Sequence, residues 1–247
     1  MRLNKILKYH LYFLLSFLII SCGNNSEIEI LDEVEVEEII EDVVIIENDT
    51  INILALGDSY TIGQSVCDEC NFPIQLKDSL QNTLRLDSVN VEIIAVTGWT
   101  TTALINSVDP VLENNSPDNI FKENDLVTLL IGVNNQYQNR PFELYENEFP
   151  ELVNKAISLT KSQSSNDLIV ISIPDYAYTP FGQSGPNPSV TSQEIDMYNS
   201  FAENHCLENG INFINITDIT RQGLINPALV ASDNLHPSEL AYRKFVE

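Results

Sequence analysis

The sequence from Thr50 onward predicts an α/β fold: a three-layer α/β/α sandwich around a doubly wound parallel sheet of about five strands. The first observation behind this prediction is that short apolar runs of strand length alternate with longer amphipathic segments of helical length. The second is that such a segment separates each strand from the next, and strands joined by helices pair in parallel. A parallel sheet needs cover on both faces, which two layers of helices supply.

The individual elements follow from the same alternation. Strands are predicted at 51–56, 89–96, 125–131, 168–173 and 211–216. Helices are predicted at 73–86, 101–108, 142–161 and 192–209, and a last helix begins near Pro237. Right-handed crossovers then favour a flavodoxin-like order of strands. The last helix is short because the chain ends at Glu247, which leaves open whether the C-terminus is complete.

Residues 1–21 are predicted to be a lipoprotein signal peptide. Three cations precede an apolar run at 11–20, which is short for a membrane-spanning helix and is followed by Ser21-Cys22. Residues 19–22 resemble the bacterial lipobox, in which the cysteine is lipidated and becomes the mature N-terminus. The alternative is an uncleaved anchor with an incidental cysteine. The position of Cys22 favours the lipoprotein, held by its lipid at the bacterial cell envelope on the periplasmic or the outer surface.

Residues 22–49 are predicted to be an acidic tether between the lipid and a domain at 50–247. Acidic and apolar residues alternate at 27–38, which a strand would also do, but so many like charges favour a self-repelling spacer. The formal net charge of the chain is −24, and it becomes −27 without residues 1–21, which hold three cations and no acid. Such a chain is unsuited to nucleic acid or to anionic lipid, so membrane contact should depend on the lipid of Cys22.

Polar residues gather after four of the predicted strands. Gly57-Asp58-Ser59 follows the first strand, Gly98 follows the second, Gly132 and Asn134 follow the third, and Asp233 and His236 follow the fifth. The carboxyl ends of parallel strands meet at one edge of a sheet, where ligands of such folds bind. We therefore expect these residues to lie close together.

The polar residues after these strands include the types that acyl transfer requires. A serine hydroxyl needs a base to become a nucleophile, and histidine serves near neutral pH. Of the three histidines, His10 lies in the predicted signal and His205 lies late in a predicted helix, where a surface position is expected. His236 remains as the base for Ser59, with Asp233 three residues earlier to orient its ring. The alternative is that Asp233 and His236 merely begin the last helix.

A transition state with a negatively charged oxygen needs fixed hydrogen-bond donors. The backbone N–H of Ser59, the backbone N–H of Gly98 and the side-chain amide of Asn134 are the candidates for this oxyanion hole. Asn134 and Asn135 could also be an ordinary polar strand end.

Taken in order, these four blocks resemble those of the GDSL, or SGNH, hydrolase family. The resemblance places the catalytic serine, histidine and acid of the family at Ser59, His236 and Asp233, and its oxyanion donors at Ser59, Gly98 and Asn134. It implies a serine esterase or acyl hydrolase with a water-exposed, adaptable site and with neither a metal nor an organic cofactor. The family usually has aspartate where this chain has Asn135, so we expect Asn135→Asp to be tolerated.

The resemblance leaves the substrate open. An acylated carbohydrate, a lysolipid or a small ester would fit, and the envelope location favours a carbohydrate ester. The alternatives are an acyltransferase acting through the same site and a non-catalytic glycan-binding lipoprotein. The loop after the fourth strand carries Tyr176, Tyr178 and Phe181. These side chains are candidates for substrate binding, and they could equally fill an apolar patch beneath the loop.

Cys67 and Cys70 form a C-x-x-C pair, which can be a disulfide, a redox centre or part of a metal site. Export favours the disulfide. Zinc would need about two further ligands, and the candidates, His205 and Cys206, come late in a helix that returns to the opposite edge of the sheet. Cys206 is then expected to be a buried free thiol.

Overall fold

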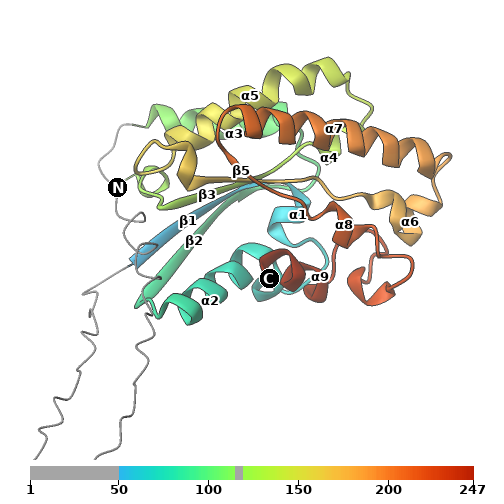
Figure 1. The fold of residues 1–247 in the computed structure, drawn as a ribbon, viewed down its shortest axis with the longest axis horizontal. Helices are drawn as coiled ribbons and strands as arrows, with labels where there is room; N and C mark the ends of the chain where they lie inside the picture. Colours follow the sequence, from blue (N-terminus) through green and yellow to red (C-terminus); the bar gives the residue numbers. More distant parts are fainter. Residues whose placement is uncertain (1–49, 115–118) are drawn as a thin grey trace, which may run out of the picture. The chain divides into compact units, whose positions relative to one another are not determined.

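A computed structural model describes residues 50–114 and 119–247 of the chain. These residues form a five-stranded, all-parallel sheet with the strand order β2-β1-β3-β4-β5 (Figure 1). The predicted fold class is therefore confirmed. The strands are β1 (Thr50–Gly57), β2 (Ser88–Ala95), β3 (Leu126–Leu130), β4 (Leu168–Ile171) and β5 (Asn212–Ile214). The predicted signal peptide, its Cys22 and the acidic tether lie outside the described residues.

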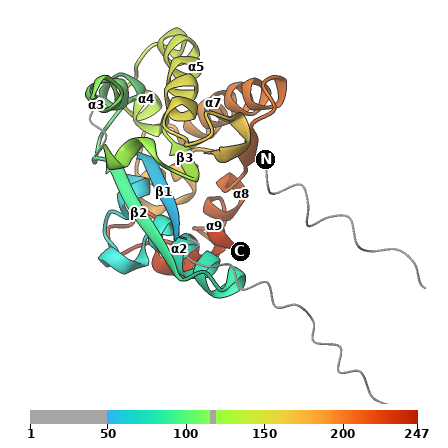
Figure 2. The same cartoon turned by 90° about the vertical axis from the view of Figure 1, so that its left-hand side faces the viewer.

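Two layers of helices enclose the sheet. On one face lie α3 (Thr101–Glu113), α5 (Phe142–Ser158) and α7 (Pro188–Glu208), and on the other lie α2 (Phe72–Leu84) and α9 (Glu239–Val246), as Figures 1 and 2 show from two directions. Within the described ranges, no helix combines the length and the apolarity that crossing a membrane would require.

Several predicted boundaries were wrong, for physical reasons. The helix α3 continues past Pro110 to Glu113, beyond the predicted end at 108, because Val111 and Leu112 still pack against the core. The helix α7 begins at Pro188, before the predicted start at 192, since proline is well tolerated in the first turn of a helix. The sequence analysis also missed four helices that are too short to show a period. They are α1 (Ser59–Ile62), α4 (Val133–Tyr137), α6 (Pro180–Gln183) and α8 (Thr217–Thr220).

The cysteines behave as predicted. Cys67 and Cys70 are joined in a disulfide around a single 3₁₀ turn between α1 and α2. Cys206 is buried in α7 as a free thiol, and burial, followed by the charge of Glu203, raises its pKa to about 12. Such a thiol is inert at neutral pH.

The order of the strands creates a switch point beside β1. The chain leaves β1 for β2 on one side, then crosses back to β3 on the other side. In the register of the sheet, Gly57 pairs with Ala95 of β2 and with Leu130 of β3, so the carboxyl ends of the three strands are level. Loops that leave such a point in opposite directions open a crevice between them, which is where doubly wound folds bind ligands.

Gly57 has no room for a side chain at this point. An added Cβ would lie 2.0 Å from Oγ1 of Thr61 and 2.5 Å from the carbonyl oxygen of Leu130. Glycine therefore allows α1 to turn back tightly against the ends of β1 and β3.

We expect Gly57→Ala to lower the free energy of unfolding by about 3 kcal/mol or more, because the methyl group meets backbone as well as a side chain. Gly210→Ala is the control. Gly210 has a positive φ of 65° but no atom within 4 Å of an added Cβ, so its substitution should cost about 1 kcal/mol. Urea unfolding of both variants measures the difference, and equal losses would show that crowding at Gly57 is unimportant.

Candidate active site

The structure brings Ser59, His236 and Asp233 into one chain of contacts. Oγ of Ser59 lies 3.0 Å from Nε2 of His236, and Nδ1 of the same ring lies 2.6 Å from Oδ2 of Asp233. A carboxylate can only accept, so Nδ1 is the donor in this contact, and in the neutral form of the ring Nε2 is left to accept from the serine hydroxyl. Ser59 is 4% exposed and His236 is 7% exposed, so these two side chains lie less open to water than expected.

Asp233 is held as a carboxylate by a full set of donors. Its Oδ1 accepts from the backbone N–H groups of Leu235 and His236, and its Oδ2 accepts from the hydroxyl of Ser65 at 2.6 Å as well as facing the His236 ring. Partial burial would raise its pKa, but these hydrogen bonds outweigh burial and lower the pKa to about 2. Sequence analysis missed Ser65, because nothing in the chain order links it to a residue so far downstream.

Asp233 and His236 do not begin the last helix. They lie in a turn that precedes it, since α9 starts at Glu239 with Ser238 as its N-cap. The turn is fixed by a backbone hydrogen bond from the N–H of Ala231 to the carbonyl of His236, at 2.8 Å. The ring of Tyr60 lies 4.8 Å from that of His236, centroid to centroid, and restricts its rotation. His205, by contrast, stacks on Phe201 near the end of α7 and is no part of this group.

Three groups that could hold an oxyanion lie around Ser59. Ser59 is the first residue of α1, where a backbone N–H has no acceptor within the helix. Gly98 adopts a φ of 83°, which favours glycine, and lines the same cavity. Asn134 lies in α4, and its Nδ2 donates to Oδ2 of Asp58 at 3.2 Å. That bond uses one amide hydrogen and leaves the other for a ligand.

Asp58 is a fully buried carboxyl beside the nucleophile. Burial raises its pKa to about 7, and the hydrogen bonds from the Tyr60 backbone N–H and from Asn134 limit the rise. In the sequence, Asp58 stands out only as part of the Gly57-Asp58-Ser59 block, which predicts no role for it. The structure shows two: Asp58 caps α1 through the N–H of Tyr60, and it orients the amide of Asn134.

Asn135 links α4 to the first residue of α3. Its Oδ1 accepts from the backbone N–H of Thr101, and its Nδ2 donates to Oγ1 of Thr101, whose hydroxyl in turn donates to Glu148 at 2.5 Å. An aspartate here would compete with Glu148 for one hydroxyl and place two carboxylates close together. This geometry changes the expectation for Asn135→Asp from tolerance to destabilisation.

A cavity of about 330 Å³ opens over Ser59. Its walls are mainly apolar and include Tyr176, Phe181 and Leu235 together with Tyr137. The structure therefore brings two of the three predicted aromatic residues to the site but not Tyr178, which lies under the Arg221 guanidinium, 5.9 Å from the ring centroid. Tyr137 was missed, although it follows Asn134 by three residues and so lies on the same side of a short helix.

The described side chains form no metal site. Across 50–114 and 119–247, no three His, Cys, Asp or Glu residues are grouped so that they could hold an ion.

Comparison with known proteins places the chain in a family. The sequence model of the GDSL-like Lipase/Acylhydrolase family matches residues 55–244, which is most of the chain. No curated protein sequence matches the chain significantly.

Solved structures share the fold at low sequence identity. A lipolytic protein of the G-D-S-L family from Veillonella parvula superposes with a TM-score of 0.61 at 16% identity, covering 79% of this chain and 94% of that protein. The psychrotrophic esterase EstA from Pseudoalteromonas sp. has a TM-score of 0.55 at 19% identity, covering 79% and 92%. An acetylxylan esterase from Geobacillus stearothermophilus has a TM-score of 0.57 at 19% identity, covering 79% and 90%. By its sequence match, the chain belongs to the GDSL-like lipase/acylhydrolase family, whose members are hydrolases of ester bonds.

Proposed function

We propose that this protein hydrolyses carboxylic esters through an acyl-enzyme on Ser59. The observation that carries the proposal is the unbroken contact chain from Ser59 Oγ through the His236 ring to Asp233, at 3.0 Å and 2.6 Å, with Ser59 and His236 lining a cavity. A base that contacts the serine hydroxyl, and an acid that orients this base, activate a serine for acyl transfer.

In the first half of the reaction, Ser59 Oγ attacks the ester carbonyl while Nε2 of His236 takes the hydroxyl proton. The carbonyl oxygen becomes negatively charged and accepts from the N–H groups of Ser59 and Gly98 and from the free amide hydrogen of Asn134. His236 then gives its proton to the leaving alcohol oxygen, the C–O bond breaks, and the acyl group remains on Ser59.

In the second half, water replaces the alcohol. His236 accepts a proton from the water as its oxygen attacks the acyl carbon, and then returns that proton to Ser59 Oγ as the acid leaves. Asp233 stays ionised throughout, because its low pKa keeps the charge that stabilises the protonated imidazole.

The proposed substrate is an acylated carbohydrate or a lysolipid at the bacterial cell envelope. The apolar walls near Ser59 suit an acyl group, and the solved acetylxylan esterase shows that this fold can serve a carbohydrate ester. The envelope location is inferred from the basic and apolar residues 1–20 and from Cys22, whose lipid would hold the protein to the membrane.

Ser59→Ala should abolish hydrolysis of 4-nitrophenyl acetate, because it removes the attacking oxygen and little else. Ser158→Ala makes the same chemical change on the exposed side of α5 and should leave the rate as it is. A fluorophosphonate probe should label the native protein and Ser158→Ala but not Ser59→Ala. Labelling of all three proteins would eliminate Ser59 as the nucleophile.

Asn134→Ala should lower kcat by about 10²–10³ with a smaller effect on KM, since an oxyanion donor matters most in the transition state. The neighbouring Asn135→Ala should instead lower the free energy of unfolding by about 1–3 kcal/mol, because it strands the buried N–H of Thr101. Steady-state kinetics and urea unfolding of both variants separate the two roles. A larger loss of kcat in Asn135→Ala would mean that the donor is misassigned.

Cys22→Ala should release the protein from the membrane fraction, because a lipid on that residue would be its main attachment. Cys206→Ala, which removes the buried free cysteine of α7, should stay with the membranes. The measurement is fractionation after a high-salt wash. Retention of Cys22→Ala in the pellet would contradict the lipoprotein interpretation.

A further inference from the structure

A second cavity lies beside the one over Ser59. It has a volume of about 400 Å³, and both cavities lie in the size range typical of small-molecule sites, about 300–1,000 Å³. The two share Tyr137, Tyr176 and Phe181 as a common wall. From this wall the second cavity extends to Val190, Thr191 and Glu194 near the beginning of α7, so the two cavities are adjacent.

We propose that the second cavity binds the saccharide part of an acyl-saccharide substrate while the acyl group lies over Ser59. This inference rests on the proposed function. It narrows the proposed substrate to an ester in which the alcohol part is a neutral saccharide with more than one sugar ring.

The polar lining of the second cavity suits hydroxyl groups. The side chains of Asn139, Asn187 and Thr191 offer both donors and acceptors, and the Glu194 carboxylate offers acceptors. A sugar hydroxyl is itself both a donor and an acceptor, so it can pair with each of these groups. The shared aromatic wall provides flat apolar surfaces for the C–H face of a sugar ring.

The charge of the cavity argues against a lysophospholipid. Among the described residues that line it, none is lysine or arginine, whereas Glu194 contributes a carboxylate. A phosphate group placed there would lie near a like charge with no cation to pair with it. A neutral polyhydroxyl ligand meets no such penalty.

The aromatic wall shared by the two cavities is tied to α7 through Gln136. The hydroxyl of Tyr176 donates to Oε1 of Gln136 at 2.7 Å, and Nε2 of Gln136 donates to Glu194 at 2.7 Å. One amide therefore links the aromatic wall to α7. Groups fixed in this way lose little freedom when a ligand binds.

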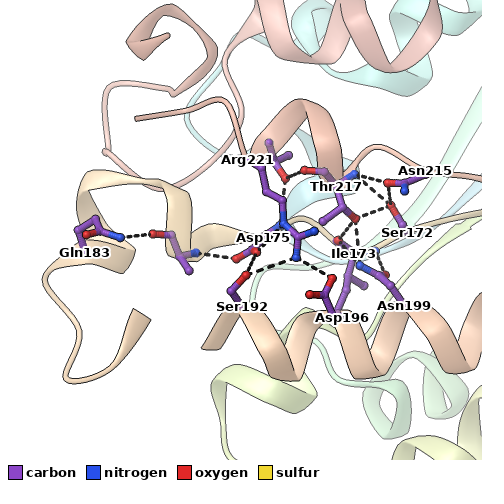
Figure 3. Close-up of polar contacts among 12 residues, drawn as sticks. Ser172, Ile173, Asp175, Gln183, Ser192, Asp196, Asn199, Asn215, Thr217 and Arg221 are labelled. Atoms are coloured by element: carbon purple, nitrogen blue, oxygen red, sulfur yellow. Dashed lines mark hydrogen bonds and ion pairs between the residues drawn. The ribbon is translucent and has the colours of Figure 1, made fainter. Parts of the chain in front are cut away.

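A buried hub fixes the same wall from behind. Asp175, which precedes Tyr176, is fully buried and accepts from the Ser192 hydroxyl of α7 at 2.5 Å and from Nε of Arg221 at 3.0 Å, as Figure 3 shows. Arg221 also donates to Asp196 of α7 at 2.6 Å. The loop that carries Tyr176 and the first turns of α7 are thus joined, so both sides of the second cavity have a defined spacing.

To test this proposal, a substitution fills the second cavity, and the rates for two substrates that carry the same acyl group are compared. Val190 lies on α7 at the cavity and is 43% exposed, so a tryptophan can replace it and fill the space without entering the core. Met197→Trp is the matched control, because it adds the same ring at an exposed site of the same helix. For each protein, kcat/KM is measured for an acetylated disaccharide and for 4-nitrophenyl acetate.

We expect Val190→Trp to lower the ratio of the two kcat/KM values, disaccharide over nitrophenyl ester, at least tenfold, mainly through KM for the disaccharide. Met197→Trp should keep the native ratio. Glu194→Gln should also lower the ratio, with Glu203→Gln on the exposed side of α7 as its control. Melting temperatures within a few degrees of the native value show that each variant is folded.

An unchanged ratio in Val190→Trp would overturn the proposal, as would faster hydrolysis of lysophosphatidylcholine than of the acetylated disaccharide by the native protein. Either result leaves the proposed function in place, since 4-nitrophenyl acetate would still be hydrolysed through Ser59. The proposed function itself fails only if the native protein hydrolyses no ester, or if Ser59→Ala hydrolyses esters as well as the native protein does.

Discussion

The candidate site depends on the register of the three strands around β1. Because Gly57, Ala95 and Leu130 pair at the same level, the loops that follow them begin at one edge and diverge around one crevice. A shift of the register would move Ser59, Gly98 and Asn134 along the strand direction by about 3.3 Å for each residue of slip, which is more than a hydrogen bond can absorb. The packing of the sheet between its two helical layers is therefore also what positions the chemistry.

Asp58 connects this scaffold to the reactive groups. Its carboxyl caps the helix that begins with Ser59 and accepts a hydrogen bond from the amide of Asn134. One side chain therefore orients both the nucleophile and an oxyanion donor. An aspartate in an unfolded chain ionises near pH 4, whereas burial raises the pKa of Asp58 to about 7. Between about pH 4 and 7 the folded protein holds a proton that the unfolded chain has lost, so this group favours the folded state less as the pH rises through that interval.

The fold and the reacting residues can be predicted from the sequence, whereas most of the contacts between these residues cannot. The five strands and five of the helices can be predicted because short apolar runs alternate with longer amphipathic segments, although their ends shift where proline or core packing intervenes, as at Pro110 and Pro188. Ser59, Gly98, Asn134 and His236 stand out because four short blocks appear in order.

Other features of the site depend on contacts between distant segments, which chain order does not reveal. Ser65 meets Asp233 across 168 residues of sequence. Tyr178 follows Tyr176 of the cavity wall by two residues but contacts Arg221 instead, because a guanidinium and an aromatic face attract one another. The second cavity is equally invisible in the sequence, since its walls come from α4, α6 and α7.

The separation of 177 residues between Ser59 and His236 has a consequence for how the protein is made. A nascent chain that has reached only β5 already contains its serine but not the base that would activate it. Contacts between residues so far apart in the sequence form late in folding, because the chain loses the entropy of closing a long loop before the contact stabilises it. Reactivity toward esters should thus appear in one step, when the turn at Asp233 docks beside α1, and incompletely synthesised chains should be harmless to the esters of the cell that produces them.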